Sequence, residues 1–489
     1  MTIRVEKASA AALMTSGGDA RILLDPATGL NRYYSAPSPR DVLAYASSTA
    51  NDVSAAAYAR AEQVLAETGP EPGPDIYAGR LERLRARIRR AYGVADDVAI
   101  VFSPSGTDLE YVALACVAGR APAGTHAVLL GADEVGSGCI HSAHGLYFAK
   151  ETALGVETLP GEPVSGLGGV HVDLVDIPVR DADGRVRPSA EIADRIEERL
   201  AAADAASRHS LVHIVHGSKT GLILPSLTDF DRLRAGHDAT FVVDACQARI
   251  TGEAVNLYLA RGAIVFVTGS KFMGGPPFSG FALVPPDLAR ESAPLPDGFA
   301  TIFRRAEWPA RWTGAEALPD SVNLGLLLRL EASVFELERF QALDPDEAAR
   351  VILAFHAAVR AEIVERTEAH RVAPYPPGDR LEADTHPIEM RTLSTLDLSE
   401  MRQGGASFED AQAWHKAMAL AGVRVGQPVK CVRLADGRWG ATLRIGLTMG
   451  QIFDFAGLDD EALHRALAAD MAAIREALIA AAGIQAPRQ

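Results

Sequence analysis

Seven short apolar runs separated by helical or turn-rich stretches, between about residues 98 and 285, constrain the fold most strongly. Most of them, among them VAIVFSP, HAVLLGA and TFVVDA, are apolar throughout rather than alternating with polar residues. This composition is typical of strands that are buried on both faces of a sheet. Helical stretches such as residues 189–208 lie between the runs. The sequence therefore predicts an α/β fold with a mainly parallel, seven-stranded sheet covered by helices.

The remaining chain divides around this sheet. The run GFALVP follows AIVFVTG too closely for a crossover helix, so we expect it to be antiparallel to its neighbours. Residues 1–90 are expected to form an N-terminal arm with helices, 91–325 a large domain and 326–489 a smaller α+β domain. For the smaller domain the patterns predict helices at 323–343, 344–370, 407–422 and 458–482, a strand near 386–394, and a hairpin turning at Asp436-Gly437.

Charge and composition exclude several classes of protein. The chain has 489 residues, a net charge of −15 and a pI of about 5.4, which argues against nucleic acid or an anionic membrane as the main partner. No apolar stretch is long enough to span a bilayer, and the N-terminus lacks the apolar segment of a signal peptide. The four cysteines show neither CxxC pairing nor metal spacing. We therefore expect a cytoplasmic protein with reduced thiols and no metal.

Ligands of an α/β sheet sit at the carboxyl ends of its strands, so the residues that follow each strand are informative. The first strand leads into SPSGT, where Ser105, Gly106 and Thr107 precede a helix. A helix N-terminus presents free N–H groups that can hold a phosphate. Taken alone, the spacing of Thr107 and Glu110 favours a plain capping box instead.

Three other strand ends carry residues that could take part in catalysis or bind a cofactor. Asp244 ends a buried apolar strand, where a carboxylate is costly unless a cation or hydrogen-bond donor meets it. Asp244 could meet a protonated pyridine nitrogen, or it could simply cap a helix by accepting hydrogen bonds from main-chain amides. The segment VHIVHGSKTG places His216, Ser218 and Lys219 after another strand, and Lys271 stands in the Gly/Pro-rich segment VTGSKFMGGPPFSG.

Together and in this order, the phosphate loop, Asp244 and Lys271 resemble the site of the fold-type I pyridoxal-phosphate enzymes, and within them the class V aminotransferase and cysteine desulfurase group. The resemblance covers roughly residues 75–450. It rests on SGT, the D-x-x-Q of Asp244 and Gln247, the H-x-S-x-T-G-x-x-x-P pattern from His216, TGSKFMGGPPFSG, and ATLRIGLTMG. It implies a pyridoxal 5′-phosphate cofactor, an amino-acid substrate, and a homodimer with the active site near the interface.

The resemblance also implies roles. Lys271 would form the Schiff base and move the proton at the substrate Cα, Asp244 would keep the pyridine nitrogen protonated, and Gln247 would lie near the ring's phenolic oxygen. Further cofactor contacts would come from Ser105, Gly106, Thr107, Thr268, Ser270, Ser218 and His216, and ring stacking from Val135, His141 or His144. Arg444 would bind the substrate carboxylate. Lys219 is a departure, because the group more often has an acidic residue there; it could bind a second anionic group of the substrate, such as a carboxylate or sulfonate, unless it turns to solvent.

The chain also departs from the cysteine desulfurases at two positions. Desulfurases have histidine where this chain has Ser270, and Cys431, the nearest candidate for their mobile cysteine, has an inert strand residue as its alternative. Aminotransfer is therefore the leading interpretation. A lyase acting by β/γ-elimination or C–S cleavage is the second, and a non-catalytic relative is the remote alternative. The group's arms reach the active site, here residues 45–54, and Ser321 and Asn323 are weak candidates for a phosphate contact across the dimer.

Overall fold

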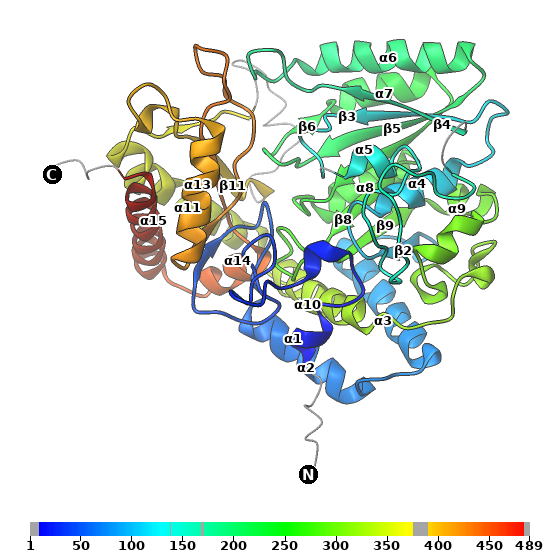
Figure 1. Cartoon of the computed structure of the whole chain (residues 1–489), viewed down its shortest axis with the longest axis horizontal. Helices are drawn as coiled ribbons and strands as arrows, with labels where there is room; N and C mark the ends of the chain where they lie inside the picture. The colour runs from blue at the N-terminus through cyan, green and yellow to red at the C-terminus, as the bar shows by residue number, and fades with distance from the viewer. Residues whose placement is uncertain (1–8, 137, 168–170, 375–389, 484–489) are drawn as a thin grey trace.

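The computed structural model describes residues 9–136, 138–167, 171–374 and 390–483 (Figure 1). Its large sheet has eight strands in the order β2-β9-β8-β7-β5-β3-β4, with β6 beside β5. The bounds along this order are Ala99–Ser103, Gly280–Val284, Ile264–Thr268, Ala239–Ala245, His209–His216, Thr125–Leu130 and Val172–Ile177, and β6 is Ile223–Leu224. The pairs that join β8, β7, β5, β3 and β4 are parallel, and β9 is antiparallel to β8 and β2. The predicted α/β fold and the reversed strand are thus confirmed.

The sheet is buried on both faces, as its unbroken apolar runs indicated. Successive residues of β8, Val265 and Phe266, belong to two different core clusters. One cluster packs the sheet against α3 (Pro74–Tyr92), α6 (Ser189–Ala205), α7 (Leu227–Gly236) and α8 (Gly252–Ala260). The other packs it against α4 (Leu109–Val117), α9 (Pro286–Glu291) and an aromatic segment that includes Trp308. Because both faces are covered, a ligand is expected at the ends of the strands, and in α/β sheets at their carboxyl ends.

A smaller α+β part follows (Figure 1). Its antiparallel sheet has the order β10-β11-β13, with bounds His370–Arg371, Leu393–Asp397 and Thr442–Gly446. Its helices are α10 (Leu324–Gln341), α11 (Pro345–Glu362), α13 (Phe408–Leu420), α14 (Met449–Ala456) and α15 (Asp460–Ala482). The four helices predicted here are present. The strand predicted near 386–394 begins outside the described residues, and β11 covers its end.

The predicted reversal at Asp436-Gly437 is present, but its two arms do not form a regular ladder. They are joined by the isolated bridges Arg433–Trp439 and Gly426–Arg444 and by the Gly440 amide, which donates to the Val432 carbonyl at 2.9 Å. The Val429 amide donates to Thr442 Oγ1 on the returning arm at 2.9 Å, whereas the Gln427 amide donates to Thr49 Oγ1 of the N-terminal arm at 2.9 Å. Strand β13 makes its ladder with β11 instead.

The N-terminal arm, blue in Figure 1, joins the two parts. It contains α1 (Ala10–Leu13), β1 (Leu43–Tyr45) and α2 (Ala55–Thr68). Strand β1 pairs in parallel with β12 (Val423–Val425), and α2 packs on α10. The segment between β1 and α2 is thus fixed at both ends. Within the described residues, none of the helices has the length and apolar character needed to cross a membrane.

Candidate active site

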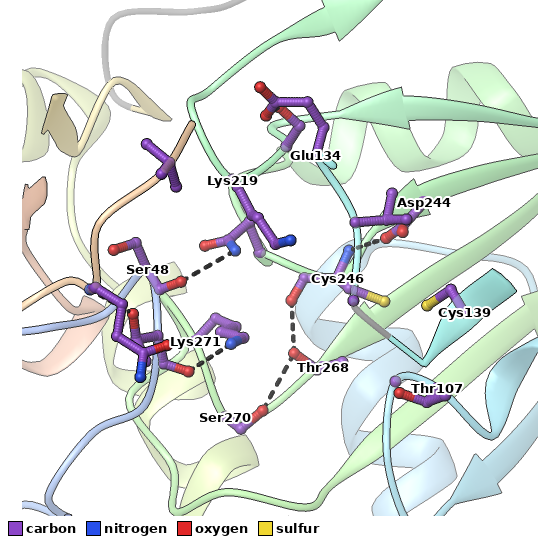
Figure 2. A pocket seen from close by; sticks show the side chains of 18 of the residues that line it. Ser48, Thr107, Glu134, Cys139, Lys219, Asp244, Cys246, Thr268, Ser270 and Lys271 are labelled. Atoms are coloured by element: carbon purple, nitrogen blue, oxygen red, sulfur yellow. Dashed lines mark hydrogen bonds between the residues drawn. The ribbon is translucent and has the colours of Figure 1, made fainter. Parts of the chain in front are cut away.

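A cavity of about 500 Å³ lies at the carboxyl ends of the central strands. Its walls come from the large sheet, the N-terminal arm and the segment before β13, and Figure 2 shows many of their side chains. The sequence-predicted residues that line it are Lys271, Asp244, Gln247, Ser105, Gly106, Thr107, Thr268, Ser270, Ser218, Lys219 and Arg444. The fold therefore brings eleven of the thirteen predicted site residues to one cavity.

Lys271 stands three residues beyond the end of β8, with its amine inside the cavity. The amine donates a hydrogen bond to the carbonyl oxygen of Thr49 in the arm (Figure 2). Burial, reinforced by the positive charges of Arg444 and Lys219, lowers the pKa of Lys271 to about 7. A substantial fraction of this amine is therefore neutral, and so nucleophilic, near neutral pH.

Asp244 lies near the carboxyl end of β7 and is 8% exposed. Its Oδ1 accepts a hydrogen bond from the Cys246 amide at 2.9 Å. Burial raises the pKa of Asp244, and the negative charge of Glu110 raises it further. A carboxylate in such a place is stabilised by a cationic partner, which a protonated pyridine nitrogen would provide.

The loop of Ser105, Gly106 and Thr107 joins β2 to α4 on the opposite wall. A Cβ added to Gly106 would lie 2.8 Å from Thr268 Cγ2, so only glycine lets these two segments approach this closely. The alternative capping box of Thr107 and Glu110 is wrong. Helix α4 has Asp108 at its N-cap, which accepts from Ser105 Oγ at 2.6 Å.

Glu110 instead turns to the neighbouring strand. One of its carboxylate oxygens lies 2.6 Å from Nε2 of His213, and both side chains are buried. Burial alone would lower the pKa of His213, but the Glu110 carboxylate outweighs this effect and raises it. Both side chains of this pair are close enough to influence the pKa of Asp244.

Glu134 is a site residue that sequence reasoning missed. Its carboxylate accepts from Ser218 Oγ at 2.6 Å and from the Thr220 amide at 3.0 Å, and pairs with Arg180 at 2.8 Å. Burial alone would raise the pKa of Glu134, but the positive charge of Arg180 outweighs this effect and holds the pKa below its usual value. This anchor fixes the loop that carries Lys219. Its only sequence signal was an acidic pair directly after an apolar run.

The arm and the segment before β13 close the cavity. Gln247 donates from Nε2 to the Ser48 carbonyl at 3.3 Å and accepts from Arg249 at 2.7 Å. Arg444 is fixed by neutral oxygens, among them the Lys219 carbonyl at 3.0 Å and Thr49 Oγ1 at 3.2 Å. Tyr33, Arg21, Cys139, Cys246, Gln427 and Lys430 also line the cavity without having been predicted.

Two predicted residues lie away from the cavity lining. His216 is buried, with Nδ1 3.1 Å from the hydroxyl of Tyr258. His141 is exposed on α5 (Cys139–Ser142). Of the other candidates for ring stacking, Val135 lines the cavity, and His144 lies 3.1 Å from the Val172 carbonyl. Asn323 caps α10 through the Leu326 amide, a structural role.

No family model matches the chain, and no curated protein is significantly similar to it in sequence. Solved structures do match. The NifS-like protein of Rickettsia africae superposes with a TM-score of 0.54 at 12% identity, over 91% of this chain and 100% of that one. The cysteine desulfurase CsdA of Escherichia coli gives 0.54 at 14% identity, over 89% and 94%. A cysteine desulfurase of Thermococcus onnurineus gives 0.53 at 14%, over 89% and 95%. The chain has the fold of the fold-type I pyridoxal-phosphate enzymes.

Pyridoxal phosphate is the cofactor to expect in this fold, and the cavity lining suits it. It offers a buried acid, a partly neutral lysine amine, and a loop of small and hydroxyl residues. No cluster of three His, Cys, Asp or Glu residues in the described ranges is arranged to hold a metal ion.

Proposed function

We propose that the chain is a pyridoxal-phosphate-dependent enzyme that acts at the α-carbon of an amino acid, and that its reaction is aminotransfer. The observation that carries the proposal is the meeting of Lys271, Asp244 and the Ser105–Thr107 loop in one cavity. When bound, pyridoxal phosphate supplies an aldehyde that captures amino groups and a ring that accepts electrons from the α-carbon.

The residues of the chain then have distinct tasks. Lys271 holds the cofactor covalently and moves the proton at the substrate Cα, for which its lowered pKa is suited. Asp244 keeps a proton on the pyridine nitrogen. The phosphate is bound by Ser105, Gly106, Thr107, Thr268 and Ser270, while Gln247 and Ser218 lie beside the ring and Arg444 binds the substrate carboxylate. The homodimer and the domain division at about residues 90 and 325 are further parts of the proposal.

Desulfuration has less support than aminotransfer. Cys431 is 5% exposed, and burial raises its pKa to about 12. It is not part of the cavity lining, whereas its neighbours Val429 and Lys430 are. A thiol in this position is poorly placed to attack a substrate sulfur. Elimination remains the alternative reaction, because it uses the same lysine and ring acid.

Two experiments test the proposal. First, the purified protein supplied with pyridoxal phosphate should be yellow, and borohydride should fix the cofactor on Lys271, as mass spectrometry of peptides would show. Lys271→Ala should abolish the adduct, and Lys416→Ala, on the exposed face of α13, should not. A protein that takes up no cofactor would refute the proposal.

Second, a panel of amino acids separates the reactions. Aminotransfer leaves the keto acid and converts the cofactor to its amine form, whereas elimination releases pyruvate or a related keto acid with ammonia or sulfide and returns the cofactor unchanged. Absorbance of the cofactor and chromatography of the products distinguish these outcomes. Keto acid formed together with stoichiometric free ammonia in the absence of an acceptor would overturn aminotransfer.

A further inference from the structure

Three cationic side chains share one region of the cavity: Lys219, Lys271 and Arg444. Lys219 and Arg444 both lower the pKa of Lys271, and Arg444 also lowers that of Lys219, in addition to the effect of burial. Like charges gathered in a partly buried cavity repel one another, which costs stability unless an anion enters. This region is therefore built to receive negative charge.

The carboxylates of the cavity wall leave this positive charge largely unbalanced. Among these carboxylates, Glu134 raises the pKa of Lys219 most. Its charge is already paired, however, with Arg180 at 2.8 Å. Asp133 also raises the pKa of Lys219, though less, and is exposed. Of the two other cations in the lining, Arg21 is paired with Asp19 at 2.6 Å, and Lys430 Nζ lies 5.2 Å from the centre of the Phe408 ring.

Arg444 can bind only one acid group of a substrate. Its Nε donates to the Gln427 carbonyl at 2.8 Å, and Nη1 to the Lys219 carbonyl at 3.0 Å and the Ser48 carbonyl at 3.3 Å. These acceptors are neutral, so the guanidinium charge is held in place but not compensated. The side chain is oriented to meet one carboxylate, and little of it remains for a second.

The ammonium group of Lys219 lies apart from that guanidinium. The Lys219 carbonyl contacts Arg444, while Nζ donates to the main-chain carbonyl of Asp133 at 3.0 Å, at the far end of the side chain. The Arg444 guanidinium is thus held at the main chain of Lys219, and the ammonium group is held at the tip of the Lys219 side chain. This separation suits two acid groups on one molecule better than a single carboxylate.

We propose that the substrate is an amino acid with a second acid group in its side chain, a carboxylate or sulfonate, and that Lys219 binds this group while Arg444 binds the α-carboxylate. The inference rests on the proposed function, because it concerns the same cavity. Lys219 is thereby a specificity-determining residue: it separates acidic amino acids from neutral ones of the same shape.

The test uses the holoenzyme and pairs of near-isosteric amino acids. L-Aspartate is compared with L-asparagine, L-glutamate with L-glutamine, and L-cysteate serves as the sulfonate. Apparent Kd values come from the change in the visible absorbance of the cofactor during titration. For at least one pair we expect the acid to bind about tenfold more tightly than its amide, the effect of about 1.4 kcal/mol. Lys219→Met should abolish that preference by weakening the binding of the acid much more than that of its amide.

The controls separate the possible failures. Lys416→Met, which removes an exposed lysine outside the cavity, should keep the preference. Absence of the absorbance band would mean that the proposed function fails. A normal band with equal affinity for acid and amide in every pair would overturn this inference alone. An equal loss for acid and amide in Lys219→Met would also overturn it, because Lys219 would then serve the α-carboxylate.

Discussion

Nε2 of His213 and a carboxylate oxygen of Glu110 are held 2.6 Å apart in the interior, on a strand and a helix that meet beside the strand of Asp244. The two side chains are 2% and 1% exposed. The charge of Glu110 raises the pKa of Asp244, and that of His213 lowers it. The pair therefore adjusts the pKa of the acid that would protonate the pyridine nitrogen, without lining the cavity itself.

Glu110→Gln should be destabilising. It removes the carboxylate that Nε2 of His213 faces in the interior, and we expect the free energy of unfolding to fall by about 1–3 kcal/mol, the usual cost of leaving a buried polar group without its partner. Urea unfolding would measure this. Glu461→Gln, which breaks an exposed ion pair with Arg465, is the matched control and should change stability by less than about 1 kcal/mol. A similarly small effect for Glu110→Gln would mean that the buried contact with His213 does not stabilise the fold.

Lys271 should make the stability of the cofactor-free protein depend on pH. Its pKa falls from 10.5 in the unfolded chain to about 7 in the folded one, so between these values the unfolded chain binds more protons. The free energy of unfolding contributed by this group therefore rises with pH across that window and is lowest below it. Lys271→Met removes the free-energy cost of burying this amine, which is present below the unfolded pKa.

Thermal melting of the cofactor-free protein tests whether the stability contributed by Lys271 rises with pH. We expect Lys271→Met to melt above the wild type at about pH 6, and the difference to shrink by about pH 10. Lys416→Met should show no such trend, because that lysine is exposed. A difference that is constant with pH would mean that the Lys271 amine is not perturbed by its surroundings.

The sequence allowed prediction of those parts of the site that follow directly from a strand. Asp244 and Lys271 each come after an unbroken apolar run, so the rule for parallel sheets placed them at one edge. Glu134, Thr49 and the Glu110–His213 pair could not be found this way. Their partners are distant in sequence: Ser218 lies 84 residues from Glu134, and Lys271 lies 222 residues from Thr49. Only the tertiary fold brings such groups together.

The glycines after Lys271 hold its loop in place. A Cβ added to Gly275 would lie 1.9 Å from Ser333 Oγ and 2.9 Å from the Gly269 carbonyl, so alanine cannot fit without displacing α10 or the loop. We expect Gly275→Ala to lower the free energy of unfolding by about 1–3 kcal/mol, as overpacking does elsewhere. Cofactor affinity should fall as well, because Lys271 would shift.

Chemical denaturation and cofactor titration would measure both effects. Gly457→Ala is the control: its φ is −73°, the nearest atom to an added Cβ is 3.5 Å away, and stability should be nearly unchanged. Adding Ser333→Gly to Gly275→Ala should recover part of the loss, since it removes the closest contact. No recovery would place the strain at the Gly269 carbonyl instead.

Two of the four cysteines should report on the position of the cofactor. Cys139 and Cys246 line the cavity beside Asp244, and their sulfur atoms point toward one another (Figure 2). Burial raises the pKa of both thiols, so alkylation will be slow. We expect pyridoxal phosphate to slow it further at these two positions by filling the space in front of them.

Maleimide labelling of the cofactor-free and cofactor-bound proteins, followed by mass spectrometry of peptides, gives the rate at each cysteine. Cys116 and Cys431 are internal controls, because both are buried outside the cavity lining and their rates should not change with cofactor. Protection of all four thiols to the same extent would indicate general tightening of the fold rather than occupancy of the cavity. Equal rates at Cys139 and Cys246 with and without cofactor would place the bound group away from Asp244, which would also remove that residue from the role proposed for it.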